Sequence, residues 1–159
     1  TLDSVWVPSS LTEGETFIWH RPEPRLQIGL ALLWEQGAFR ILGNYVAIEE
    51  TSTAPNLKVG AGVQGIGTGN PGYFATSEKN FRWAQGALNV YAGLAYRANE
   101  NHAHGIGGIK FAPLGPWSLG LQLDGHDGNP YLTYAFDRFV FGVYFVGYET
   151  PGYLLGVRF

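Results

Sequence analysis

The 159-residue chain contains no cysteine, few charged residues and no long hydrophobic run. Without cysteine, the fold uses neither a disulfide nor a thiolate metal site. No uninterrupted apolar segment approaches the ~20 residues that a membrane-spanning helix requires, so a helical membrane protein is excluded. Any segment of this chain that crosses a membrane must therefore be a strand.

Charge is scarce as well, at 14% of the residues against roughly 25% in typical soluble domains. The net charge is −3 and the ten Lys and Arg residues form no basic patch, so we expect no nucleic-acid partner. Aromatic residues reach 15% and glycines number 23, which is unusual for a water-soluble surface. The first residues have neither the cationic nor the apolar segment of a signal peptide, so an exported protein would be in its mature form.

The length and even composition predict a single domain over residues 1–159. Gly or Pro interrupts almost every ten-residue window and apolar residues recur at every second position, which predicts an all-β chain. The clear strands are expected over residues 26–34, 39–48, 57–65, 87–97, 105–112, 117–126, 131–136, 139–149 and 153–159. Residues 73–80 are a weaker candidate because their middle is polar. Residues 1–25, interrupted by Pro22 and Pro24, are expected to be an N-terminal extension or a first strand.

The polar faces of these strands indicate which side meets water. Their commonest residues are Gly, Ala, Gln and Asn, whereas the wet face of a soluble sheet would carry Lys, Glu and Thr. Small side chains suit the narrow interior of a barrel. The apolar faces of the clear strands hold no charge, as expected where Arg or Lys facing lipid costs ~2–4 kcal/mol. The sequence therefore predicts a closed antiparallel up-and-down transmembrane β-barrel of about eight to ten strands.

The last expected strand carries a resemblance to a family. Tyr153, Leu155, Val157 and Phe159 alternate with small, apolar or basic residues, and Phe159 is the final residue of the sequence. This pattern resembles the C-terminal signature of bacterial outer-membrane proteins. The resemblance implies a location in the bacterial outer membrane. It also implies the lipid bilayer and the outer-membrane assembly machinery as partners, with other envelope proteins as further candidates.

Two sets of side chains follow from the expected register. Aromatic residues near strand ends are expected at headgroup depth: Trp34, Tyr96, Trp117, Phe136, Tyr148 and Tyr153. Polar residues are expected to form a network inside the barrel: Arg40, Lys58, Gln64, Arg97, Lys110, Gln122, Asp124 and Arg158. Because unpaired charges in a narrow lumen are unfavourable, we expect contacts with Asp124, Glu78 or water that largely plug it.

No catalytic or cofactor motif stands out, so the sequence predicts neither an enzyme nor a cofactor. There is no Gly-x-Ser-x-Gly elbow and no recognisable triad. Asp124, His126 and Asp127 are weak metal candidates because they collect oxygen and imidazole groups in a short span, but Asp-Gly and Gly-Asn are ordinary turn sequences. The paired histidines of segment 99–104 are similar, since a solvated loop explains them equally well.

The function that these observations favour is a membrane-embedded barrel with a structural, interaction or anchoring role. Two alternatives stay open. One is a narrow passive channel for ions or small solutes. The other is a soluble secreted β-barrel that binds an apolar ligand inside.

Overall fold

The computed structural model describes residues 1–6, 14–34, 36–63 and 71–159. In these residues the chain forms antiparallel strands and no helix. The strands are β1 (Leu2–Trp6), β2 (Glu15–Glu23), β3 (Leu26–Leu33), β4 (Ala38–Ile48), β5 (Asn56–Val63), β6 (Pro71–Trp83), β7 (Gly86–Arg97), β8 (Ala103–Pro113), β9 (Trp117–Leu123), β10 (Gly128–Phe136), β11 (Phe139–Val146) and β12 (Thr150–Val157). Within the described residues, no helical segment has the length and apolar character needed to cross a bilayer.

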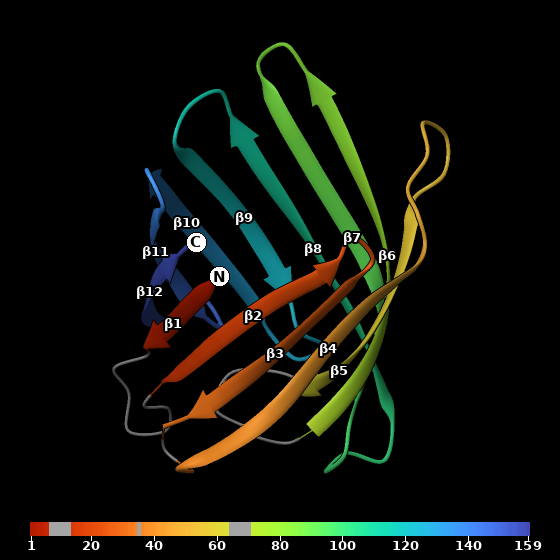
Figure 1. Ribbon diagram of the computed structural model, residues 1–159, viewed down its shortest axis with the longest axis vertical. Coiled ribbons are helices and arrows are strands. Elements are labelled where there is room, and N and C mark those ends of the chain that lie inside the picture. The colour runs from red at the N-terminus through yellow and green to blue at the C-terminus, as the bar shows by residue number, and fades with distance from the viewer. Residues whose placement is uncertain (7–13, 35, 64–70) are drawn as a thin grey trace.

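From β2 to β12, each strand is hydrogen-bonded to the strands before and after it in the sequence, so the sheet is an up-and-down meander (Figure 1). β1 pairs with β2 on one side and with β12 on the other, which joins the first strand to the last. The prediction of an all-β, antiparallel, up-and-down sheet is confirmed. The expected eight to ten strands were too few, because the described residues form twelve.

The extra strands come from the N-terminal region. Residues 1–25, expected to be an extension or one strand, contain both β1 and β2. Pro22 does not end β2, because it lies within the register shift between His20 and Glu23. A proline is tolerated at such a bulge, since no ladder hydrogen bond is needed there.

Alternating strand direction gathers the connections at two ends of the sheet. The turn end has both chain termini and the connections 24–25, 49–55, 84–85, 114–116 and 137–138. The loop end has the connections 98–102, 124–127 and 147–149, together with Trp34, Gln36 and Gly37 between β3 and β4. The β6–β7 and β8–β9 turns lie at the top of Figure 1, and β3 ends toward the bottom.

Inside the curved sheet, five aromatic side chains lie over glycines directly opposite them on the next strand. The pairs are Trp19 with Gly29, Phe74 with Gly60, Tyr91 with Gly108, Tyr131 with Gly120, and Tyr144 with Gly152. A Cβ added to these glycines would lie 2.3–2.6 Å from the nearest atom of the aromatic side chain. The small residues of the inner face therefore make room for large rings.

The inner face is not polar throughout. Ala31, Leu33 and Leu42 are buried on β3 and β4, and Phe17 and Trp19 of β2 pack against them. This small apolar cluster is filled by the chain's own side chains. It forms one wall of the interior, and the polar groups described below belong mainly to the strands from β5 onward.

Candidate functional site: the polar lumen

Two cavities are lined by described residues of the inner face. The larger, of about 550 Å³, is lined by side chains from β7 to β12. Its wall follows β9 from Ser118 to Gln122, continues to Asp124 in the next connection, and follows β10 from Asn129 to Ala135. The smaller, of about 330 Å³, is lined by residues of β4 to β8. Tyr91 lines both cavities, so its ring lies at the boundary between them.

The structure brings together half of the eight residues expected in the lumen. Four line the larger cavity: Lys110, Gln122, Asp124 and Arg158. Lys58 lines the smaller cavity, and Arg97 is buried within ion-pair reach of Asp124. Arg40 occupies a position on the same face of β4. Gln64 lies outside the described residues.

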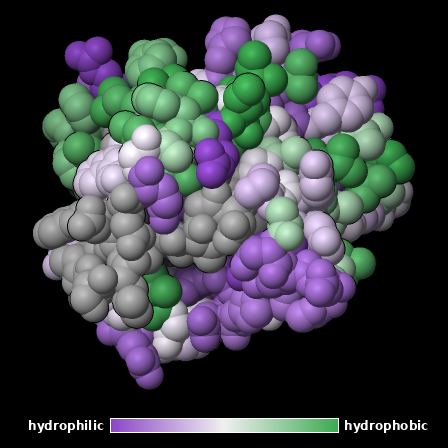
Figure 2. All heavy atoms as spheres, turned by 90° about the horizontal axis from the view of Figure 1, so that it is seen from below, coloured by the Kyte–Doolittle hydropathy of each residue, from purple (hydrophilic) through white to green (hydrophobic). Residues whose placement is uncertain are grey.

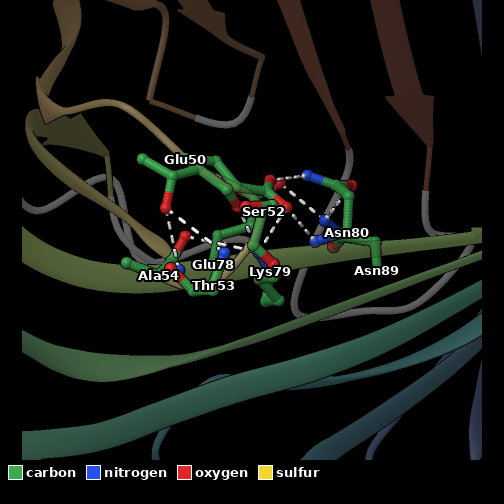
Figure 3. Close-up of polar contacts among 9 residues, drawn as sticks. Glu50, Ser52, Thr53, Ala54, Glu78, Lys79, Asn80 and Asn89 are labelled. Atoms are coloured by element: carbon green, nitrogen blue, oxygen red, sulfur yellow. Dashed lines mark hydrogen bonds and ion pairs between the residues drawn. The ribbon is translucent and has the colours of Figure 1, made fainter.

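An ion pair and two amides form a polar cluster on the inner face toward the turn end, and Figure 3 labels its Glu78, Asn80 and Asn89. Lys58 Nζ lies 2.7 Å from Glu78 Oε2. Asn89 Nδ2 donates to Glu78 Oε1 at 2.6 Å and to Asn80 Oδ1 at 2.9 Å. Each polar group therefore has a partner from a neighbouring strand, which is how charges are tolerated in a confined interior.

Hydrogen bonds hold the connection 49–55 against the C-terminal part of β6. They come from Asn80, which belongs to the same cluster, and from the neighbouring Lys79. Asn80 donates through its backbone N–H and its side-chain amide to Glu50, at 3.0 and 2.6 Å. These two hydrogen bonds, with the adjacent Lys79 ammonium, lower the pKa of Glu50. Lys79 also donates to the carbonyl oxygens of Thr51, Ser52 and Ala54. One lysine thus holds three carbonyl groups of this connection, as Figure 3 shows.

A second cluster lies at the loop end, around Arg97. Its side chain is 7% exposed, and Nη1 lies 3.3 Å from Glu100 Oε1. Nη2 donates to the backbone carbonyl of Asp124 at 3.1 Å. His126 Nε2 lies 3.2 Å from the same Glu100 oxygen. Arg97 therefore links the β7–β8 connection to the β9–β10 connection.

The weak metal candidates Asp124, His126 and Asp127 do not converge. Asp124 Oδ1 accepts from the backbone N–H groups of His126 and Asp127, at 3.0 and 2.9 Å, as in an Asx turn. Burial of Asp124 acts to raise its pKa, but these hydrogen bonds and Arg97 outweigh burial and lower the pKa. His126 instead faces Glu100 and His104, which sequence reasoning did not connect with it.

The outer face is covered by hydrophobic side chains. Among the described residues, thirty large hydrophobic side chains are exposed, whereas five hydrophobic residues are buried. β11 shows the pattern, because Phe139, Phe141, Val143 and Phe145 all face outward and are 36–47% exposed. Seen from below, hydrophobic side chains form broad patches on the outline of the molecule, with hydrophilic ones between them (Figure 2).

The six aromatic residues expected near strand ends are 41–63% exposed. Trp34 and Tyr96 lie at the loop end with Tyr148, and Trp117 and Phe136 lie at the turn end. Tyr153 lies further inside its strand, as the fourth residue of β12. Of the signature residues on and after β12, Tyr153, Leu155 and Phe159 are exposed, and Val157 is half-buried.

No protein-family model matches the chain, and no curated protein sequence matches it.

Proposed function

We propose that the chain is a transmembrane β-barrel of a bacterial outer membrane, with a structural, interaction or anchoring role in the envelope. The observation that carries the proposal is the inside-out distribution of hydrophobic side chains. Ion pairs line the interior, while most large hydrophobic side chains point outward. Soluble monomers rarely expose such continuous apolar surface, because it would drive association.

Strand pairing supports the same proposal. In lipid, every backbone polar group of a spanning segment needs an internal partner, which a sheet meets only when it has no free edge. The pairing of β1 with both β2 and β12 supplies partners to the two strands that would otherwise be edges.

The two ends give a proposed orientation. Four of the five turn-end connections have two or three residues, and both termini lie at this end. Outer-membrane barrels have short periplasmic turns and longer outer loops. The turn end then faces the periplasm. Tyr153, Leu155 and Phe159 face outward, so the assembly machinery could bind them first and the lipid bilayer would surround them afterwards. Other envelope proteins are candidate partners of the loops at the opposite end.

A matched pair of leucine substitutions tests the proposal. Leu132 lies in the middle of β10 and is 45% exposed, and Leu114 lies in the β8–β9 turn and is 76% exposed. In a bilayer, Leu132→Arg is expected to lower the free energy of unfolding by ~2–4 kcal/mol and Leu114→Arg by at most ~1 kcal/mol. Urea unfolding in lipid vesicles measures both. A protein that is monodisperse in plain buffer, with both variants unchanged in stability, would refute the membrane assignment and favour a soluble barrel.

A narrow passive channel is the second candidate, and the larger cavity favours it. The cavity follows most of the length of β9 and β10, and Lys110 and Arg158 line it. Within the described residues, no carboxylate forms an ion pair with either cation. Such a passage would favour anions, because fixed positive charge raises the local anion concentration.

Reversal potentials in planar bilayers separate the two candidates. A channel should conduct, and Lys110→Glu should shift its selectivity toward cations. Arg138→Glu makes the same change of charge in the exposed β10–β11 turn and should leave the selectivity unchanged. Absence of conductance from inserted, folded barrels would reject the channel and leave the anchoring role.

A further inference from the structure

Three side chains, from two connections and from the beginning of β8, meet at the loop end. Glu100 belongs to the β7–β8 connection, His104 is the second residue of β8, and His126 belongs to the β9–β10 connection. One ligand atom from each lies within 4.8 Å of the others. Glu100 is the centre of the group, since its Oε1 lies 3.2 Å from His126 Nε2 and its Oε2 lies 2.5 Å from His104 Nε2.

Two atoms of this group are buried without a hydrogen bond. His104 is 9% exposed, and its Nε2 has no hydrogen-bond partner. Glu100 Oε2 is equally buried and unpartnered, because the approach of the two groups lacks hydrogen-bond geometry despite the short distance. A buried polar atom without a partner is unfavourable by roughly 1–3 kcal/mol. The two atoms therefore lie side by side in one small space, where neither has a hydrogen bond.

We infer that Glu100, His104 and His126 bind a divalent transition-metal ion of the zinc class. Two imidazoles and one carboxylate are a ligand set that zinc uses, with a further position left to water. Bond lengths of 2.0–2.2 Å at tetrahedral angles place ligand atoms about 3.3 Å apart. The Glu100–His126 separation already fits, and a small rotation of Glu100 away from His104 would admit the ion.

Three histidine rings lie side by side at the site, and imidazole nitrogens are common ligands of transition metals. The ring centroids of His104 and His126 are 4.3 Å apart, and those of His102 and His104 are 4.4 Å apart. Arg97 Nη1 lies 3.3 Å from Glu100 Oε1, the oxygen that His126 also approaches, and fixes the carboxylate in place, the role that residues behind a ligand usually have.

Bound metal would join the β7–β8 connection to the β9–β10 connection beside the larger cavity, whose lining includes Asp124. The site would therefore hold the loop end of the lumen in one arrangement. This inference does not depend on the membrane assignment, because all three ligands lie in or beside connections.

The test is titration of the tag-free, folded chain in detergent with Co²⁺ and then Zn²⁺. We expect one ion per chain, visible absorption bands of four-coordinate Co²⁺, and their loss when Zn²⁺ displaces it. His104→Ala and His126→Ala should each weaken binding by at least about 100-fold, since even residues behind a ligand contribute 10–100-fold. His20→Ala is the matched control, because His20 is exposed on β2.

Folding of each variant is checked by heat-modifiable migration on a gel. Glu100→Gln keeps the side-chain size and should weaken binding by at least about 10-fold if a histidine variant fails to fold. If the wild-type chain binds no stoichiometric metal ion in this titration, the inference is wrong. It is also wrong if both histidine variants retain the binding, or if His20→Ala weakens it as much as they do.

Discussion

Replacing Gly152 by alanine tests whether the glycines of the inner face make room for aromatic rings. Gly152 lies on β12 opposite Tyr144 of β11, whose side chain is 7% exposed. A Cβ at this position would lie 2.4 Å from Cε1 and Cζ of the ring and 2.8 Å from its hydroxyl oxygen. The ring must move within a packed wall, and overpacking of this kind typically costs ~1–3 kcal/mol. We expect Gly152→Ala to lower the free energy of unfolding by that amount.

The assay is reversible urea unfolding in detergent micelles, followed by tryptophan fluorescence. Gly43→Ala is the control, because no atom lies within 4 Å of a Cβ built there, and its effect should stay within about 0.5 kcal/mol. Tyr144→Ala removes the obstructing ring. In that background Gly152→Ala should be close to neutral, giving a coupling energy similar in size to the single-variant loss.

Two results would refute this reasoning. If Gly152→Ala and Gly43→Ala have the same effect, the contact with the ring carries no energy. If the loss persists in the Tyr144→Ala background, it comes from the backbone of β12 and not from the ring.

Three further predictions concern the interior and the turn end. Glu78→Gln should destabilise the barrel by about 1–3 kcal/mol in urea unfolding, because it leaves the half-buried Lys58 without its anion. The lowered pKa of Glu50 stabilises the 49–55 connection above the unfolded-state pKa of about 4.3. That stabilisation is lost as the pH falls through the folded pKa, so hydrogen-exchange protection of the Asn80 amide should drop below about pH 4 in wild type but not in Glu50→Gln. If the barrel conducts, Tyr91→Ala should raise its single-channel conductance by joining the two cavities, and an unchanged value would place the constriction elsewhere.

The alternation of side chains was enough to predict the sheet, but not its number of strands. Period-two patterning identifies a strand whose two faces differ, and from β3 onward it predicts every strand, although β6 only in part. It fails in residues 1–25, because a proline predicts a break whereas Pro22 lies at a register shift within β2. It also underestimated β6, whose Glu78 and Lys79 make the middle of the strand polar on both faces. Glu78 is matched by Lys58, and Lys79 by the carbonyl groups of the 49–55 connection, partners that a single strand cannot reveal.

The loop-end cluster shows a different limit of sequence reasoning. The paired histidines of segment 99–104 are equally typical of a solvated loop, and the Asp-Gly and Gly-Asn pairs of segment 124–129 are typical of ordinary turns. What joins them is topology: the β7–β8 and β9–β10 connections lie at the same end because strand direction alternates. Glu100 had no distinguishing pattern of its own. It becomes a candidate ligand only when His126 is brought beside it.

The number of strands also changes the explanation for the small residues of the inner face. Glycine on the polar faces predicted a cramped interior of eight to ten strands, but the described residues form twelve, and the diameter of a closed barrel grows with strand number. Much of the inner face is occupied by aromatic rings such as Tyr91, Tyr131 and Tyr144, which lie against glycines of the adjacent strand. In the proposed barrel, a ring held in this way narrows the lumen without contributing charge. We therefore expect substitution of these three tyrosines to change conductance more than substitution of the ion-paired residues.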